Sequence, residues 1–247
     1  MKRLLLSVLF ALSLTQVGYA ALTDGLVAYY KLDESSGNAS DSSGAGNTLT
    51  NSGTTAFTTG KINNGVNFTA TAGQRLSITS ALGYTSTVDR TWAYWVKSTT
   101  FGGYLVDNTL TDTTGRMLMY QNTPTSDIRL WVNGNELATS ALTTGTWYYI
   151  VVTKSGSTYT FYLNNSSLGT VSPGAAVGYP QNLFYLGSSL SGGSESNAVV
   201  DEFGIWSRVL SATEISQLYN GGAGLAYPFA TSPTYTNGFF KFFRKTH

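Results

Sequence analysis

The stretch that decides the fold runs from Val199 to Gly222 and reads VVDEFGIWSRVLSATEISQLYNGG. Its first third predicts a β-strand, because its residues alternate as they do on the two faces of a strand. The predicted faces are Val199, Asp201, Phe203 and Ile205 on one side and Val200, Glu202, Gly204 and Trp206 on the other. On this pattern the adjacent carboxyls of Asp201 and Glu202 point to opposite sides of the sheet.

A short capped helix is predicted to follow this strand. Ser211 and Glu214 have the spacing of a capping box, in which the serine hydroxyl accepts a backbone N–H and the glutamate reaches back to the cap. Leu210 precedes the cap and is placed to pack on Ile215. Apolar residues at helical spacing follow, and Asn-Gly-Gly at 220–222 ends the helix by allowing a left-handed residue.

Composition excludes several classes of function. Only 11% of the 247 residues are charged, whereas 27 are glycine and 16 are tyrosine, a mixture that suits short strands and tight turns. The net charge of +1 provides no basic field, so we expect no nucleic acid partner. Cysteine is absent and the one histidine is His247, which argues against disulfides, thiol chemistry, histidine zinc sites and a Ser-His-Asp triad.

Strand patterns recur at regular spacing along the rest of the chain. They cover Gly25 to Leu32, Arg90 to Val96, Tyr104 to Val106, Met117 to Tyr120, Ile128 to Val132, Trp147 to Thr153, Thr158 to Leu163 and Leu183 to Leu186. Asn133-Gly134 predicts a type I′ turn, and Ser155-Gly156 and Asn164-Asn165 predict further tight turns. Many strands with one late helix predict an all-β fold, a two-sheet antiparallel jelly-roll sandwich in one domain with one short helix near the C-terminal end.

The N-terminal segment, Met1 to Ala20, has the features of a secretory signal peptide. Lys2 and Arg3 precede the apolar run 4–14, and small residues stand at the end of the segment. The apolar run is shorter than the ~20 residues that a membrane span needs. We therefore expect no transmembrane span after signal cleavage, and a secreted or cell-surface protein.

Three segments are expected: the signal peptide 1–20, the jelly-roll domain 21–228 and a C-terminal tail 229–247. In the tail, Phe239, Phe240, Phe242 and Phe243 interleave with Lys241, Arg244 and Lys245. The tail is interpreted as disordered or loosely docked, and the alternative is a short anchor for an anionic surface.

Both ends of the predicted domain carry motifs that resemble a known family. The closing motif is an Asp-Glu-aromatic strand, an arginine-containing turn and Leu-Ser-x-x-Glu-Ile-x-x-Leu-Tyr before glycine, at 201–221. The opening motif is the first strand followed by Asp33-Glu34-Ser-Ser-Gly and Asp41-Ser-Ser-Gly. The chain thus resembles the laminin-G-like (LamG) domains of the concanavalin A-like lectin/glucanase superfamily. The resemblance implies a jelly roll whose opening and closing stretches lie side by side, with sugars, proteins or steroids as ligands. Gly65 to Phe68 fits the next strand of this family.

The resemblance also implies a structural calcium ion where these two stretches meet. Calcium takes 6–8 oxygen ligands from carboxylates and backbone carbonyls in flexible loops. Asp41 and Asp201 are the predicted side-chain ligands, with Asn47 as a further candidate. The alternative is that Asp41 caps its own turn and that backbone N–H groups satisfy Asp201.

Outward-facing aromatic residues are the candidates for binding sugar rings, because such rings stack on flat aromatic faces. Trp131 falls on the strand face opposite Ile128, Leu130 and Val132, with Arg129 nearby. Tyr104 is the second aromatic candidate. The alternative is that Trp131 only fills a cross-strand pair.

Catalysis is not expected from the acidic residues. Retaining glycoside hydrolysis needs two carboxyls about 5–5.5 Å apart, and no cluster of acidic residues with strand spacing stands out. The sequence therefore predicts a secreted, non-catalytic module that recognises carbohydrate or a cell-surface glycan. Two alternatives remain, a structural or adhesion protein that binds extracellular protein partners and a glycoside hydrolase or lyase.

Overall fold

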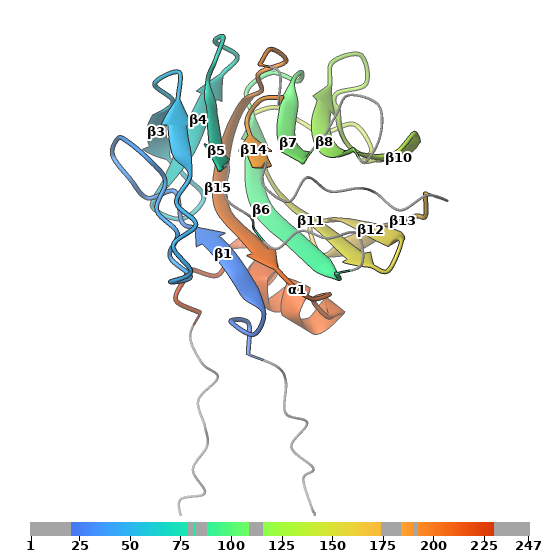
Figure 1. The fold of residues 1–247 in the computed structure, drawn as a ribbon. Coiled ribbons are helices and arrows are strands. Elements are labelled where there is room, and N and C mark those ends of the chain that lie inside the picture. Colours follow the sequence, from blue (N-terminus) through green and yellow to red (C-terminus); the bar gives the residue numbers. More distant parts are fainter. Residues whose placement is uncertain are drawn as a thin grey trace, which may run out of the picture.

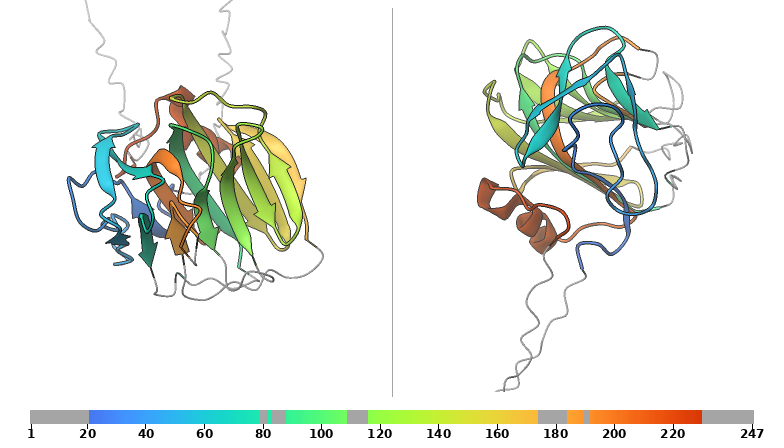
Figure 2. Two further views of the ribbon diagram at one scale, coloured as in Figure 1. Left: turned by 90° about the horizontal axis from the view of Figure 1, so that it is seen from above. Right: turned by 90° about the vertical axis from the view of Figure 1, so that its left-hand side faces the viewer.

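The computed structural model describes residues 21–78, 82, 88–108, 116–173, 184–189 and 192–229. The predicted signal peptide 1–20 and residues 230–247 of the predicted tail lie outside this part of the chain. Within it, two antiparallel sheets pack face to face and one short helix follows the last strand (Figures 1 and 2). The prediction of an all-β sandwich is confirmed.

Among the described residues, the larger sheet contains eight strands in the order β13-β12-β11-β6-β15-β4-β3, with β1 paired to β15. They are β1 (Leu26–Tyr30), β3 (Ala56–Thr59), β4 (Asn64–Thr69), β6 (Arg90–Ser98), β11 (Trp147–Ser155), β12 (Thr158–Leu163), β13 (Ser166–Val171) and β15 (Asn197–Trp206). In the same part of the chain, the smaller sheet has seven strands in the order β10-β9-β8-β7-β14-β5-β2. They are β2 (Thr50–Ser52), β5 (Arg75–Ile78), β7 (Tyr104–Asn108), β8 (Met117–Asn122), β9 (Asp127–Val132), β10 (Asn135–Ala138) and β14 (Phe184–Leu186).

An apolar core fills the space between the sheets. Trp92, Tyr94 and Val96 of β6 and Ile128 and Leu130 of β9 all belong to it, and all are fully buried. Successive side chains of a strand point to opposite sides, so the other residues of these strands face outward. Each sheet therefore has an outer face whose chemistry is independent of the core.

The opening and closing stretches lie side by side, because β15 pairs with β1 as well as with β6 and β4. Helix α1 (Ala212–Tyr219) begins with the predicted capping box: the Ser211 side chain accepts the N–H of Glu214, and the Glu214 carboxylate accepts the N–H of Ser211. The helix ends at Asn220, which is left-handed with φ 48°. Both features agree with the prediction from the sequence.

A β-bulge in β15 makes the predicted alternation of its side chains wrong. The register against β6 shifts between Asp201 and Gly204, and Glu202 has a φ of 49°, in the left-handed region. The extra residue moves the alternation by one position, so Val200 and Phe203 both face the core between the sheets.

The same bulge brings two carboxyls to one side of the sheet. Asp201 pairs with Trp95 of β6 on the outer face, and Glu202 accepts a hydrogen bond from the Tyr29 hydroxyl on that face. The expectation that Asp201 and Glu202 point to opposite sides is therefore also wrong. The sequence pattern could not show the bulge, because Glu202 is not a residue type that marks left-handed backbone.

The predicted tight turns are present. Asn133 and Gly134 join β9 to β10 with φ of 45° and 83°, and Asn164 and Asn165 join β12 to β13 with φ of 47° and 69°. Two successive positive φ angles are the requirement of a type I′ turn. Gly156, also with positive φ, lies in the hairpin between β11 and β12.

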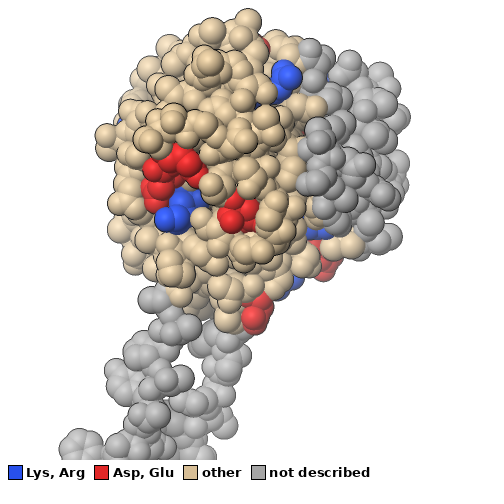
Figure 3. Space-filling view, turned by 60° about the vertical axis from the view of Figure 1, so that its left-hand side comes forward, with Lys and Arg blue, Asp and Glu red and all other residues tan. Residues whose placement is uncertain are grey.

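Charged side chains are sparse on the face of the molecule shown in Figure 3. On the side turned forward in Figure 3, small groups of acidic and basic side chains lie in a surface that is otherwise uncharged. Helix α1 has 8 residues, and in the part of the chain that the structure describes no helix is long and apolar enough to cross a membrane.

Candidate functional site

The central part of the outer face of the eight-stranded sheet is covered. Helix α1 lies against it (Figure 2), and residues from the helix and from the segment that follows it form a second apolar core with the sheet. Its buried members are Leu22, Tyr29, Ala93, Trp95, Tyr149, Val151, Trp206, Leu210, Ile215, Leu218 and Phe229. Because Phe229 is 7% exposed, the packed region extends at least to this residue.

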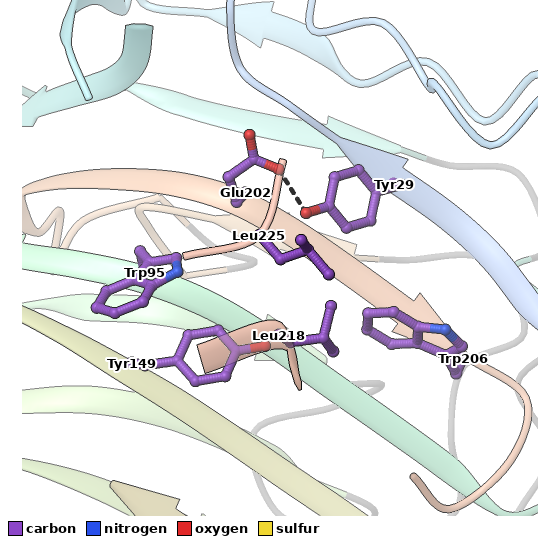
Figure 4. A pocket seen from close by; sticks show the side chains of 7 residues that line it. All are labelled: Tyr29, Trp95, Tyr149, Glu202, Trp206, Leu218 and Leu225. Atoms are coloured by element: carbon purple, nitrogen blue, oxygen red, sulfur yellow. Dashed lines mark hydrogen bonds between the residues drawn. The ribbon is translucent and has the colours of Figure 1, made fainter. Parts of the chain in front are cut away.

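A narrow crevice lies within this second core (Figure 4). It is lined by Tyr29, Trp95, Tyr149, Glu202, Trp206, Leu218 and Leu225. The empty space between these side chains, about 200 Å³ together with its opening to solvent, has no room for a water molecule. A ligand needs considerably more room than that, so the crevice is packed interior rather than a binding cavity.

Two buried carboxyls stand beside this crevice. Asp201 is fully buried, and it accepts N–H groups from Lys61 at 2.7 Å, Ile62 at 2.8 Å and Glu202 at 2.8 Å. Glu202 is 4% exposed and accepts the Tyr29 hydroxyl. Burial raises the pKa of Asp201 to about 8 and that of Glu202 to about 7. Perturbed carboxyls can mark catalytic sites, but the crevice that the described residues form beside these two leaves no space for a substrate.

The predicted calcium ligands lie in two separate hydrogen-bonding groups. Asp41 accepts the N–H groups of Tyr29 at 3.0 Å, Ser43 at 2.9 Å and Asn47 at 2.9 Å. The structure therefore brings Asp41 and Asn47 together beside β1. Asp201 is bonded instead to the backbone of Lys61, Ile62 and Glu202.

This arrangement agrees with the alternative in which both aspartates bind backbone N–H groups. Each of the two carboxylates already accepts three such donors. Within the described residues, no group of three or more histidine or acidic side chains is arranged to hold a metal ion. Calcium bound by Asp41, Asp201 and Asn47 stays a prediction, and this donor geometry does not favour it.

The three predicted ligand-binding residues, in contrast, lie together on the outer face of the seven-stranded sheet. Tyr104 on β7 pairs with Tyr120 on β8, which pairs with Arg129 on β9. In the next row on the same face, Leu118 pairs with Trp131. The rings of Tyr104 and Tyr120 meet edge to face, with centroids 6.1 Å apart, and the side chains of Tyr104, Arg129 and Trp131 are half-buried.

A hydrogen-bonded network fixes the polar groups of this face. Arg129 donates to Asp127 at 2.9 Å, to Glu136 at 2.7 Å and to Thr125 at 3.1 Å, and the Tyr120 hydroxyl donates to Glu136. Hydrogen bonds to Asp127 raise the pKa of Arg129, which keeps its charge at all ordinary pH values. Burial and the bond to Glu136 raise the pKa of Tyr120 to about 12, so its hydroxyl stays a donor.

The sequence analysis missed Tyr120, Glu136 and Arg116. Tyr120 could have been found, because it alternates with the buried Met117 and Met119 on one strand. Glu136 joins the face through the pairing of β10 with β9, and Arg116 through a guanidinium 5.2 Å from the Tyr104 ring centroid. No local sequence pattern predicts either contact.

Two stacked antiparallel sheets with a short closing helix define a concanavalin A-like sandwich. Residues 63–216 match the Laminin_G_3 family, described as the concanavalin A-like lectin/glucanases superfamily, and the chain belongs to this family. Among curated proteins, none matches the chain.

Solved structures with this fold have low sequence identity to the chain. The binding domain of Paraclostridial Mosquitocidal Protein 1 has a TM-score of 0.65 at 15% identity, over 81% of this chain and 53% of that one. The binding domain of Botulinum neurotoxin DC, in complex with rat synaptotagmin II, has a TM-score of 0.65 at 11% identity, over 81% and 52%. Domain 4 of AbnA, a GH43 extracellular arabinanase from Geobacillus stearothermophilus, in complex with arabinotriose, has a TM-score of 0.60 at 18% identity, over 81% and 98%. The chain spans about half the length of the first two, and these likenesses show the fold alone.

Proposed function

We propose that this chain is a secreted, non-catalytic recognition module that binds carbohydrate through the outer face of its seven-stranded sheet. The observation that carries the proposal is the register of β7, β8 and β9, which aligns Tyr104, Tyr120 and Trp131 with the Arg129 network. Sugar-binding sites combine aromatic surfaces with a few fixed polar groups, and this face offers both.

The positions of the carboxyls support a role in binding rather than catalysis. Asp201 and Glu202 are buried, and Asp127 and Glu136 are both bonded to Arg129. Secretion is supported by the signal-peptide pattern of residues 1–20. Similar folds include the extracellular arabinanase domain, solved in complex with arabinotriose.

A protein partner is the second candidate function. Tyrosine, tryptophan and arginine, the residue types of this face, are also enriched at protein interfaces. The neurotoxin binding domain of similar fold was solved in complex with rat synaptotagmin II. On this alternative the chain acts in adhesion, and the same face recognises an extracellular protein.

The test is titration of the full chain with a panel of soluble polysaccharides, followed by calorimetry and tryptophan fluorescence. Replacement of Trp131 by alanine (Trp131→Ala) removes the largest aromatic surface of the face, and we expect affinity to fall at least about tenfold. Trp147→Ala is the matched control, because Trp147 is a half-buried tryptophan on the other sheet. Equal affinity of the Trp131→Ala variant and the wild type, with both folded, would contradict binding at this face.

A further inference from the structure

Two arginines on the outer face of the seven-stranded sheet differ in what their guanidinium groups contact. All three guanidinium nitrogens of Arg129 donate hydrogen bonds, to Asp127, Glu136 and Thr125. Among the described residues, no side chain or carbonyl accepts a hydrogen bond from the guanidinium of Arg116, and its Nε is buried without a partner. Arg129, the arginine predicted from the sequence, is therefore bonded through all three of its guanidinium nitrogens, whereas the guanidinium of Arg116 is bonded to none of the described residues.

Arg116 is nevertheless held in place. Its N–H donates to Asn133 Oδ1 at 3.1 Å and its carbonyl accepts the N–H of Asn133 at 3.2 Å, which anchors the backbone to the β9–β10 turn. Its guanidinium carbon lies 5.2 Å from the ring centroid of Tyr104, within the range of a cation–π contact. A positioned cation that forms no ion pair within the described part of the chain is arranged to receive an anion from outside.

The register also fixes the position of Arg116 relative to Trp131. Leu118 pairs directly with Trp131, and Arg116, which immediately precedes β8, lies opposite Asn133 through their backbone contacts. Arg116 and Trp131 are thus diagonal neighbours, about 7–8 Å apart in an antiparallel pair. One sugar ring stacked on Trp131 can bring a substituent within reach of Arg116 across that distance.

We propose that Arg116 selects the ligand, and that the ligand is a glycan that carries carboxylate groups, such as a chain of uronic acids. This inference rests on the proposed function of the same face. The planar guanidinium presents parallel N–H groups that match the two oxygens of a carboxylate, which a neutral hydroxyl cannot do. Trp131 and Tyr104 provide the stacking surface, and Arg116 provides the discrimination between charged and neutral chains.

Arg116 is better placed to bind a carboxylate of the ligand than Arg75, because Arg75 lies near an acidic side chain. The second arginine–tyrosine pair on the face, Arg75 with Tyr185 at 5.7 Å, stands near Glu195. Burial acts to raise the pKa of Glu195, but N–H bonds from Gly73 and Gly193, together with the charge of Arg75, lower it. Arg75 therefore already faces a carboxylate. Asp107, on the same face as Arg116, is 1% exposed and forms no ion pair with Arg116 among the described residues.

The test compares matched pairs of polymers: pectate, alginate and glucuronoxylan, each with the same chain after its carboxyls are reduced to alcohols. We expect wild-type protein to bind at least one carboxylated polymer about tenfold more tightly than its reduced form. The preference should weaken as NaCl rises, because exposed charges are screened. Arg116→Gln should bind both forms equally, and Arg116→Lys should retain part of the preference, since a point charge lacks the planar fork.

Lys97→Gln is the control variant. It removes one positive charge from a similar pair, Lys97 over Trp147 at 4.9 Å, on the other sheet, and we expect the preference to stay. A wild type that binds carboxylated and reduced chains equally overturns the inference but leaves carbohydrate binding in place. Retained preference in Arg116→Gln overturns the role of Arg116. Absence of binding to every polymer overturns both this inference and the proposed function.

Discussion

Aromatic residues lie on the outer faces of both sheets, but they have different roles on the two faces. On the eight-stranded sheet, Trp95 and Trp206 are 2% and 1% exposed beneath α1 and the segment that follows it. On the seven-stranded sheet, Trp131 and Tyr104 are half-buried and stand beside charged groups. Aromatic content alone does not distinguish them. Because helix α1 packs on the eight-stranded sheet, the aromatic residues there stabilise the fold, whereas those of the seven-stranded sheet can contact a ligand.

The largest effect that the comparison predicts is on stability. Trp206 packs against Tyr29 with its ring centroid 6.4 Å away, and its Nε1 donates to the Leu22 carbonyl at 2.7 Å. We expect Trp206→Ala to lower the free energy of unfolding by about 3–5 kcal/mol, because it leaves a cavity and an unpaired carbonyl. Denaturant unfolding followed by circular dichroism measures this change.

The same unfolding measurement on Trp131→Ala tests the outer face of the seven-stranded sheet. Loss of this half-buried side chain, which lies outside both apolar cores, should lower the free energy of unfolding by about 1 kcal/mol or less. If Trp131→Ala lowers the free energy of unfolding as much as Trp206→Ala does, the inferred difference between the two faces is contradicted. In that case Trp131 supports the fold rather than a binding face.

The next effect concerns pH, and it arises from two buried carboxyls of the eight-stranded sheet. The pKa of Asp201 is raised to about 8 and that of Glu202 to about 7, both by burial, so the folded state holds these protons more tightly than the unfolded state. Their contribution to stability is complete below about pH 4, where the unfolded groups are also protonated. It is lost as pH rises through the folded pKa values. We therefore expect the melting temperature to fall by about 5 °C or more between pH 5 and pH 8.5.

Glu202→Gln tests the source of this dependence. The amide has nearly the same shape, can still accept the Tyr29 hydroxyl and does not titrate, so the slope of melting temperature against pH should become shallower. Asp24→Asn, which changes an exposed carboxyl, should keep the wild-type slope. Identical slopes for Glu202→Gln and the wild type would mean that other groups produce the dependence.

The smallest effect is expected from metal. Backbone N–H groups already occupy the carboxylates of Asp41 and Asp201, so we expect added calcium to raise the melting temperature by less than about 2 °C over EDTA. A rise of several degrees that disappears in Asp41→Asn would establish the calcium site predicted from the sequence.

Much of the fold could be predicted from interactions between residues that are close together in the chain. The capping box of Ser211 and Glu214 and the Asn133-Gly134 turn depend only on residues close together in the chain, and both were predictable. Strands β2, β3, β5, β10 and β13 were not predicted. They are short or partly exposed, and their pairing depends on partners elsewhere in the chain.

The candidate site was predictable only in part. Trp131 and Arg129 could be placed on one strand face because alternation is a local property. Their proximity to Tyr104 follows from the register of three strands, which the sequence pattern does not specify. The bulge at Glu202 shows the same limit, since it reverses which residues of β15 face the core.

The sequence by itself determined the class of fold, the late helix with its caps, the tight turns and the outward position of Trp131. These depend on backbone preferences and on period-two patterning, which act over a few residues. Only the tertiary structure decided that Arg129 is bonded to two acidic side chains while Arg116 is bonded to none of the described ones, and that Asp201 and Glu202 are buried together. Hydrogen-bond partners and burial depend on which distant strands lie side by side, and no local pattern carries that information.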